Sequence, residues 1–422
     1  MIERSLARQI IESLRKGVPP QRGVQLYSTG NEKLLDGIKE EHLSSIDEFG
    51  RIRFLSGSWG AGKTHFFRLV REAAFENNCL LSNVELNVNE AALNKFEKVF
   101  YSIVRKISTP ACYERDMSAD AAPFGTVLEE ALVYLGTGTR SGVQSQVEHA
   151  CYARACERLM VDRGMDIDFR KIVQKYWETF LPEAPDPAVV ETERGEILDW
   201  FSGEGRVSDY RKRFGIAKMV TRDNAKLMLQ SLAQLARLCG YRGLVILFDE
   251  AEQAYSIMRK SALRAAHDNL RSLMDNVEAL PGLFLIYATT PEFYTDPKYG
   301  IVIYGALSGR IGRPEHRSPR ARDLIWNLDA VEPTEEDYVA AARKIRMIYA
   351  SAYPDHAGAL PGDEEIERFV LELYKIHPSL SAVRFWRVLV TAVIAHNDDH
   401  VDGDVRPDQE VYDSIMDRLR DS

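Results

Sequence analysis

The stretch Phe54–Glu72, FLSGSWGAGKTHFFRLVRE, decides how the rest of the chain is interpreted. From Gly57 to Thr64 it satisfies the pattern G-x-x-x-x-G-K-[ST]. A loop with this spacing wraps a phosphate with successive backbone N–H groups, and a side chain at either glycine would obstruct the approach. An amphipathic helix predicted directly after the loop, over 63–76, points its N-terminus at the same anion. The stretch therefore predicts a phosphate-binding loop between a strand and a helix.

Two side chains of this loop have specific predicted roles. Lys63 is expected to neutralise the β- and γ-phosphates of a nucleoside triphosphate, and the Thr64 hydroxyl to coordinate Mg²⁺. The alternative is a glycine loop without a ligand, for which pattern and strand–helix context would have to coincide by chance. The residues expected to contact the nucleotide here are Ser58, Trp59, Gly60, Ala61, Gly62, Lys63, Thr64 and His65.

A second predicted strand ends in two carboxylates. Leu244–Phe248 is a continuous apolar run, and Asp249 and Glu250 follow it. Ligands of open α/β sheets lie beyond the carboxyl ends of the strands, so Asp249 is expected to hold Mg²⁺, directly or through water. Glu250 is expected to polarise an attacking water as general base. The plainer alternative is that the acidic pair only ends a strand at the surface.

One further strand, predicted over Leu283–Thr289, ends in a hydroxyl side chain. Some ATPases place an extra strand between the loop strand and the acidic strand, and a polar residue at its end reaches between the water and the γ-phosphate. Thr289 is the candidate for this sensor role. Threonine is also common at strand ends for structural reasons alone.

Three arginines are candidates for contact with the γ-phosphate. The loop predicted over 304–322 contains Arg310 and Arg313, and in ring-forming ATPases an arginine from this region enters the neighbouring subunit's site. Arg310 is the first choice and Arg313 the second, although the many arginines here equally fit a solvated loop or a phosphate-contacting patch. Arg384, at a predicted helix start, is expected to reach the γ-phosphate from a helical lid; an ordinary surface arginine is the alternative.

Composition excludes several classes of protein. The 422 residues contain 54 Lys and Arg against 63 Asp and Glu, a formal net charge of -9, which argues against a histone-like nucleic-acid binder but permits a local basic patch. No apolar run reaches the ~18 residues of a membrane span, and the N-terminal residues lack the pattern of a secretory signal. Five scattered cysteines without a C-x-x-C pair indicate reduced thiols, and together these features predict a cytoplasmic protein.

A possible metal motif is weak at the sequence level. His396 and His400 are four residues apart, a spacing that can bind a metal on a helix. No third ligand is evident, so a solvated helix end is the expectation.

The order of the predicted elements indicates an α/β protein with a parallel sheet. Strands are predicted over 51–56, 80–88, 244–249, 283–289 and 324–328, an extended segment over 24–27, and helices over 3–15, 33–49, 63–76, 92–107 and 261–277. The expected domains are an N-terminal segment (1–50), a P-loop core (51–109 and 240–330), a large, mostly α-helical insertion (110–239) and a C-terminal helical lid (331–422).

With these features in order, the chain resembles an AAA+-type (ASCE) P-loop ATPase of the initiator-like branch, and more narrowly the ATP-binding proteins of BREX phage-defence systems. The resemblance rests on SLRKGVPPQRGVQLYSTGNEKLL (13–35), FLSGSWGAGKTHFFRLVRE (54–72), LCGYRGLVILFDEAEQ (238–253) and YGALSGRI (304–311). It implies ATP binding in concert with other defence-system proteins, and packing of Arg22, Gly23 and Val24 near the adenine.

Three functions follow as hypotheses. The first is a Mg²⁺-dependent ATPase, acting as a switch or motor in a homo-oligomer where a neighbour's Arg310 completes the site. The second is a nucleotide-stabilised scaffold with little turnover. The third is an initiator-like DNA loader, for which DNA contact, direct or through a partner, stays open because the acidic composition counts only against autonomous binding. A membrane partner is not expected.

Overall fold

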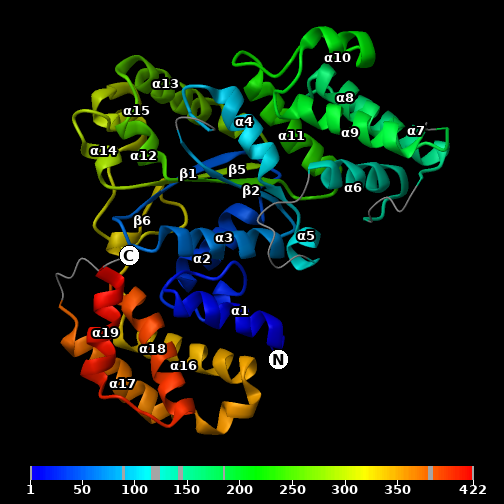
Figure 1. The fold of residues 1–422 in the computed structure, drawn as a ribbon. Coiled ribbons are helices and arrows are strands. Elements are labelled where there is room, and N and C mark those ends of the chain that lie inside the picture. The colour runs from blue at the N-terminus through cyan, green and yellow to red at the C-terminus, as the bar shows by residue number, and fades with distance from the viewer. Residues whose placement is uncertain are drawn as a thin grey trace.

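A single mixed sheet lies at the centre of the molecule (Figure 1). The computed structural model describes residues 2–87, 91–115, 124–140, 146–183, 186–378 and 384–420. Its strands are β1 (Arg51–Ser56), β2 (Leu80–Glu85), β3 (Ile107–Ser108), β4 (Leu244–Asp249), β5 (Leu283–Thr289) and β6 (Ile325–Asn327). The order across the sheet is β3-β2-β4-β5-β1-β6, and every described pair is parallel except β2 with β3. The predicted extra strand, β5, therefore does lie between the loop strand β1 and the acidic strand β4.

The two central strands β4 and β5 are apolar along most of their length because helices cover both faces of the sheet. Successive side chains of a strand point to opposite faces. In β1, Phe54 belongs to one hydrophobic cluster and Leu55 to the other. Ile246 and Leu247 of β4 divide in the same way. Two-sided burial explains why the bounds of β1, β4 and β5 agree with those predicted from apolar runs.

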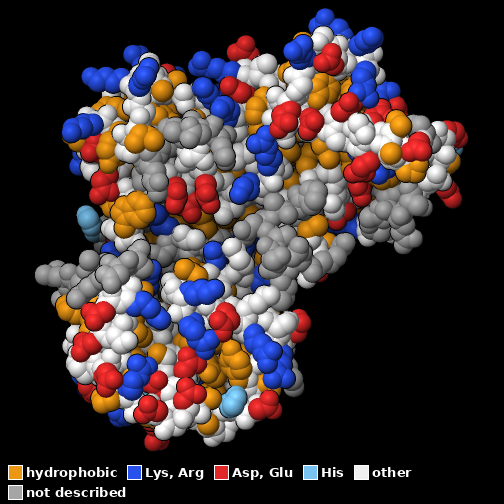
Figure 2. All heavy atoms as spheres, in the orientation of Figure 1, with side chains coloured by type: hydrophobic (Ala, Val, Ile, Leu, Met, Phe, Trp, Pro, Cys, Tyr) orange, Lys and Arg blue, Asp and Glu red, His pale blue; other side chains and the backbone are white. Residues whose placement is uncertain are grey.

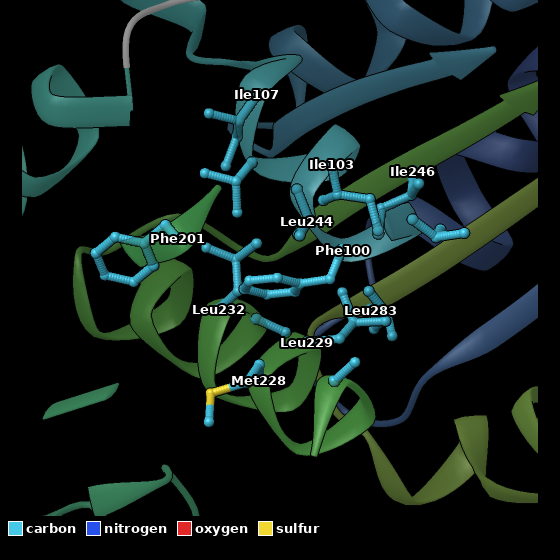
Figure 3. Close-up of a cluster of buried hydrophobic side chains, with 14 of the residues drawn as sticks. Phe100, Ile103, Ile107, Phe201, Met228, Leu229, Leu232, Leu244, Ile246 and Leu283 are labelled. Atoms are coloured by element: carbon cyan, nitrogen blue, oxygen red, sulfur yellow. The ribbon is translucent and has the colours of Figure 1, made fainter. Parts of the chain in front are cut away.

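One face of the sheet packs against α4 (Phe96–Arg105) and α11 (Ala225–Leu238), as Figure 3 shows. Phe100 of α4 and Leu232 of α11 lie over Leu244 of β4. The helices α6 to α10 extend from this face to one side of the molecule (Figure 1). The remaining helices between β3 and β4 are α5 (Pro110–Arg115), α6 (Phe124–Thr137), α7 (His149–Val161), α8 (Ile167–Glu178), α9 (Pro187–Phe201) and α10 (Val207–Phe214).

The opposite face is covered by α3 (Lys63–Glu76), the helix predicted after the loop. Below it in Figure 1, α1 (Arg4–Arg15) packs against α16 (Glu335–Ala352) and α18 (Phe385–Asp402). The first helix of the chain thus lies among its last helices, which also include α17 (Asp363–Ile376) and α19 (Asp408–Arg420). None of the helices that the structure describes has the length and apolar content to cross a bilayer.

Several predicted elements differ from those observed. The segment predicted as extended over 24–27 is a 3-10 helix, η1 (Val24–Leu26), because its N–H groups turn toward one carboxylate, described below. The predicted loop over 304–322 contains a short helix, α15 (Gly305–Ile311). The prediction missed this helix because its two glycines have a low helix propensity. The helix predicted over 33–49 is shorter, α2 (Glu32–Ile38) followed by a π-helical turn, η2 (Lys39–Leu43), and β3 was missed because a two-residue strand has no periodicity.

The other described elements lie between β4 and β6 in the chain or follow β6. They are α12 (Ala251–Ser256), α13 (Lys260–Asn276), η3 (Val277–Ala279), α14 (Glu292–Thr295), η4 (Ile301–Ile303), η5 (Leu328–Ala330) and η6 (Pro354–Ala359).

Candidate nucleotide-binding site

The phosphate-binding loop joins β1 to α3 at the carboxyl edge of the sheet. The Gly57 N–H donates to the Thr289 carbonyl oxygen at 3.1 Å, which anchors the loop to β5. Gly60 and Gly62 adopt φ values of 77° and 90°, a region that favours glycine. A Cβ at Gly57 would lie 2.9 Å from the Ala61 Cβ. The glycines of the motif are therefore needed for the shape of the loop itself.

Lys63 folds its side chain back into this loop. Its Nζ donates to the Gly57 carbonyl oxygen at 2.7 Å and lies 3.4 Å from the Ser58 carbonyl oxygen. The ammonium is also 5.6 Å from the ring centre of Trp59, a side chain that is 65% exposed. Exposed Thr64 is the second residue of α3, directly after Lys63. The loop thus holds a cation at its centre that is hydrogen-bonded to the loop's own carbonyl groups.

The acidic end of β4 faces this cation. Burial raises the pKa of Asp249, and the nearby Lys63 ammonium opposes that rise. The pKa of Glu250 is raised by burial and by the charges of Asp249 and Glu85, with Lys63 again opposing. Glu85 reaches the same place because it pairs with Asp249 in the register of β2 and β4. Asp249 and Glu250 therefore lie within range of the Lys63 charge, and Glu85 lies beside them on the neighbouring strand.

Glu250 has an unusual backbone. Its φ is 56°, in the left-handed region, where a residue with a Cβ costs about 1–2 kcal/mol. Its N–H donates to the Asp249 Oδ1 at 3.0 Å, which holds the two acids together. Such outliers cluster at functional sites, where the surrounding structure maintains them.

Asp329 lies in η5, directly after β6, and contacts the phosphate-binding loop. This residue was not predicted from the sequence. One of its oxygens, Oδ2, accepts from the Ser58 N–H at 2.8 Å and from the Ser58 hydroxyl at 2.7 Å. The other, Oδ1, accepts from Arg384 Nη2 at 2.9 Å. The structure thus brings Arg384 to the loop through a carboxylate 271 residues from Ser58 in the chain.

Two other predicted residues have their side chains engaged elsewhere. Thr289 is fully buried, and its hydroxyl lies 3.3 Å from the Leu55 carbonyl oxygen and 2.8 Å from the Tyr294 hydroxyl. Exposed Arg310 donates through Nε to Asp275 Oδ1 at 2.7 Å. The structure therefore brings neither the Thr289 hydroxyl nor Arg310 to the loop of its own chain. Arg313 is likewise an exposed side chain.

The segment predicted to lie near the adenine wraps around Glu72 of α3. The Glu72 carboxylate accepts from the N–H groups of Gly23, Val24 and Gln25 at 2.5–3.1 Å. Arg22 stacks on the ring of Tyr113 at 4.8 Å. Glu72 lies nine residues beyond Lys63, roughly 14 Å along the helix axis at 1.5 Å per residue.

His65 connects the first turn of α3 to the same segment. Its two ring nitrogens lie 3.4 Å from the Tyr27 hydroxyl and 3.0 Å from the Ser28 hydroxyl. Burial, assisted by Arg68, lowers the pKa of His65 to about 4, so the ring is neutral at physiological pH. The His65 imidazole thus has a structural role, because it links α3 to the N-terminal segment.

The donors at the loop suit Mg²⁺. Hard divalent cations take oxygen ligands, and the Thr64 hydroxyl and the carboxylates of Asp249 and Glu250 are all of that kind. A helix N-terminus, the glycine-rich loop and a lysine meet the other requirement, an anionic phosphate.

The sheet order, the loop and the facing carboxylates define an α/β protein of the P-loop type. Comparison of the whole chain with family models then identifies the family: the model for the BREX system ATP-binding protein BrxC/D matches residues 2–419. The chain belongs to this family, which confirms the narrower resemblance predicted from the sequence, to the ATP-binding proteins of BREX systems. No curated protein matched the chain. The family places the protein among the ATP-binding components of BREX defence.

Proposed function

We propose that this protein is a Mg²⁺-dependent ATPase of the AAA+ type that acts as a switch or motor in BREX defence. The observation that carries the proposal is the placement of Asp249 and Glu250 at the end of β4, within range of the Lys63 charge in the loop after β1. A phosphate-binding loop alone serves many reactions. A loop faced by a carboxylate pair at the neighbouring strand end is suited to hydrolysis, because one acid binds the metal and the other activates water.

The roles of the residues follow from this arrangement. Lys63 leaves the Gly57 carbonyl oxygen and moves onto the β- and γ-phosphates, while the loop N–H groups bind the same anion. Thr64 and Asp249 hold Mg²⁺, which when bound neutralises charge on the phosphates. Glu250 accepts a proton from the attacking water. Thr289 as sensor, and Arg22, Gly23 and Val24 as adenine contacts, stay predictions.

The C-terminal helices act as a lid in this proposal. Arg384 precedes α18 and already contacts the loop through Asp329. A γ-phosphate offers Arg384 a stronger partner than the partly exposed Asp329 carboxylate, since phosphate carries more charge. Exchange of one partner for the other would shift the lid when ATP binds and again when phosphate leaves. We propose the domain division given above, 1–50, 51–109 with 240–330, 110–239 and 331–422, on this basis.

A second subunit completes the site. Arg310 is exposed and paired only with Asp275 and the Ala306 carbonyl oxygen among the described residues, so it is available to a neighbouring chain. An arginine supplied from another subunit stabilises the transition-state charge of phosphoryl transfer. The proposal therefore includes a homo-oligomer and other defence-system proteins as partners. The five free cysteines fit the reducing cytoplasm.

The decisive experiment compares ATP turnover of the wild-type protein with Glu250→Gln, after both are shown to bind ATP equally. We expect turnover in the wild type and a loss of about 10²–10⁴-fold in the variant, as for removal of a general base. Equal and negligible rates, measured with the defence partners present as well as without them, would favour the nucleotide-stabilised scaffold.

DNA loading is the remaining alternative. On the face in Figure 2, basic and acidic side chains stand side by side over most of the described surface. This mixture favours DNA contact through a partner over autonomous binding. A gel shift with the protein alone at low salt tests the point, and a salt-dependent shift would favour the loader.

A further inference from the structure

Three potential metal ligands meet between α17 and α18, remote in sequence from the phosphate-binding loop. They are Glu365 of α17 and His396 and His400 of α18, each of which offers one ligand atom, and these atoms lie within 4.8 Å of one another. The two histidines share one face of α18 because residues four apart are neighbours on a helix. His400 Nε2 lies 3.4 Å from Glu365 Oε1.

His396 is the member that needs an explanation. Its side chain is 1% exposed, and neither ring nitrogen has a hydrogen-bond partner among the described residues. The ring stacks on Phe369 of α17, with centroids 4.0 Å apart and planes 8° apart, which fixes its orientation. Buried polar atoms in proteins nearly always have partners, and leaving one without a partner is destabilising. A ligand between α17 and α18 would provide the missing partner.

We propose that Glu365, His396 and His400 bind a divalent transition-metal ion, with Zn²⁺ as the best match, and that the ion joins α17 to α18. Two imidazoles and one carboxylate are a ligand set that zinc accepts, with the fourth position left to water or another group. Imidazole ligands disfavour Mg²⁺ and Ca²⁺, which take oxygen.

The geometry requires only a small adjustment. Metal–ligand bonds of about 2.0–2.1 Å in a tetrahedron place the ligand atoms roughly 3.3 Å apart, closer than the 4.8 Å limit seen here. Glu365 can supply the movement, since its side chain is 38% exposed and its nearest cation, Arg368, is 4.0 Å away. Arg368 in turn pairs with Asp408 at 3.3 Å, which offsets its repulsion of a bound cation.

This site replaces the expectation of a solvated helix end for the histidine pair. His396 is buried instead of solvated, and the third ligand comes from a different helix. The spacing of His396 and His400 in the sequence indicated these two ligands but not the third. Glu365 could not be selected from the sequence because the pairing of α17 with α18 brings it to the site.

The test uses the full-length protein, freed of metal by a chelator and then titrated with Zn²⁺ by calorimetry. We expect one Zn²⁺ per chain and an unfolding temperature several degrees higher with zinc, since an ion that binds the folded state stabilises it. Co²⁺ in place of Zn²⁺ should give the visible absorption of a tetrahedral site. His400→Ala and Glu365→Gln, which change partly exposed side chains, should each weaken Zn²⁺ binding by more than ~100-fold, beyond the cost of losing an outer-shell partner.

Two controls locate the ion. His149→Ala removes an exposed histidine that pairs with a single glutamate, Glu183, and should leave Zn²⁺ binding unchanged. Lys63→Ala should also leave it unchanged, which separates this site from the nucleotide site. The proposal is overturned if the wild type binds no Zn²⁺, or if His400→Ala and Glu365→Gln bind it as tightly as the wild type does.

Discussion

Arg384 is tied to the phosphate-binding loop by Asp329, whose Oδ1 accepts from the arginine Nη2 at 2.9 Å. The same carboxylate accepts from the N–H and the hydroxyl of Ser58. A triphosphate in the loop would require these donors for itself. Asp329 therefore competes with the nucleotide, and its negative charge opposes the approach of another anion.

Replacing Asp329 should strengthen ATP binding. We expect Asp329→Ala to raise the affinity up to about five-fold, because a partly exposed ion pair contributes at most about 1 kcal/mol. Calorimetry with a non-hydrolysable ATP analogue measures the change. Asp363→Ala, which breaks a partly exposed ion pair with Arg346 in the same group of helices, is the matched control and should bind as the wild type does. Weaker binding by Asp329→Ala would mean that Asp329 organises the loop for its ligand.

Lys63→Ala should abolish measurable ATP binding. The variant loses the one loop cation that faces both the phosphates and the acidic strand end, and hydrogen bonds to charged groups contribute about 1.5–3 kcal/mol each. The fold should persist, since the hydrogen bonds of Lys63 in the described part of the chain go to carbonyl groups of the loop itself. Calorimetry and circular dichroism check the two statements. Unchanged ATP affinity in a folded Lys63→Ala protein would refute the site assignment.

The elements that the sequence predicted best are those specified by local pattern. The strand 244–249 and the helix 63–76 have the predicted bounds, because continuous apolar runs and flanking glycines identify them without reference to the rest of the chain. The acidic pair at Asp249 and Glu250 follows from the same local pattern. A local sequence pattern cannot identify a contact with a residue from a distant segment of the chain.

The residues missed by sequence reasoning all act at long range. Asp329 reaches Ser58 only because β6 lies beside β1, and Glu72 binds backbone N–H groups of a segment 47–49 residues earlier. Neither carboxylate belongs to a sequence motif. The partners of both are main-chain groups, or side chains that only the fold brings close. The place of β5 between the loop strand and the acidic strand was predictable from ATPases that have such an extra strand, whereas these contacts required the structure.

Arg310→Ala should leave ATP binding intact and slow hydrolysis. The guanidinium contacts only Asp275 and a carbonyl oxygen within the described part of its own chain, and both contacts are exposed, so stability should change by less than about 1 kcal/mol. An arginine acting in a neighbour's site is worth up to ~10³–10⁵ in rate. Turnover measured at increasing protein concentration tests this. Lost ATP binding would instead assign Arg310 to its own subunit or indicate a damaged fold.

The pH dependence of hydrolysis should reveal the three clustered carboxylates. Glu250 must be deprotonated to act as a base, and its pKa is raised by burial, Asp249 and Glu85. Activity should therefore fall with decreasing pH at a point above the ordinary glutamate value of about 4.3. Glu85→Gln removes one of the charges that raise this pKa, so the acidic limb of the kcat profile should move to lower pH. If the acidic limb of the kcat profile does not move in Glu85→Gln, Glu250 is not the group that accepts the proton in the rate-limiting step.

Glu72 should be the most important single carboxylate for stability in the N-terminal part of the chain. It is 5% exposed and accepts from three consecutive N–H groups and from the Tyr113 hydroxyl at 3.1 Å. Glu72→Ala leaves these donors unpaired, and one unsatisfied buried group costs about 1–3 kcal/mol, so we expect a loss of roughly 3 kcal/mol in the free energy of unfolding. Urea denaturation measures it. Glu76→Ala, one turn further along α3, removes a partly exposed pair with Lys39 and should cost less than about 1 kcal/mol. Equal losses in the two variants would mean that the turn around Glu72 does not depend on its carboxylate.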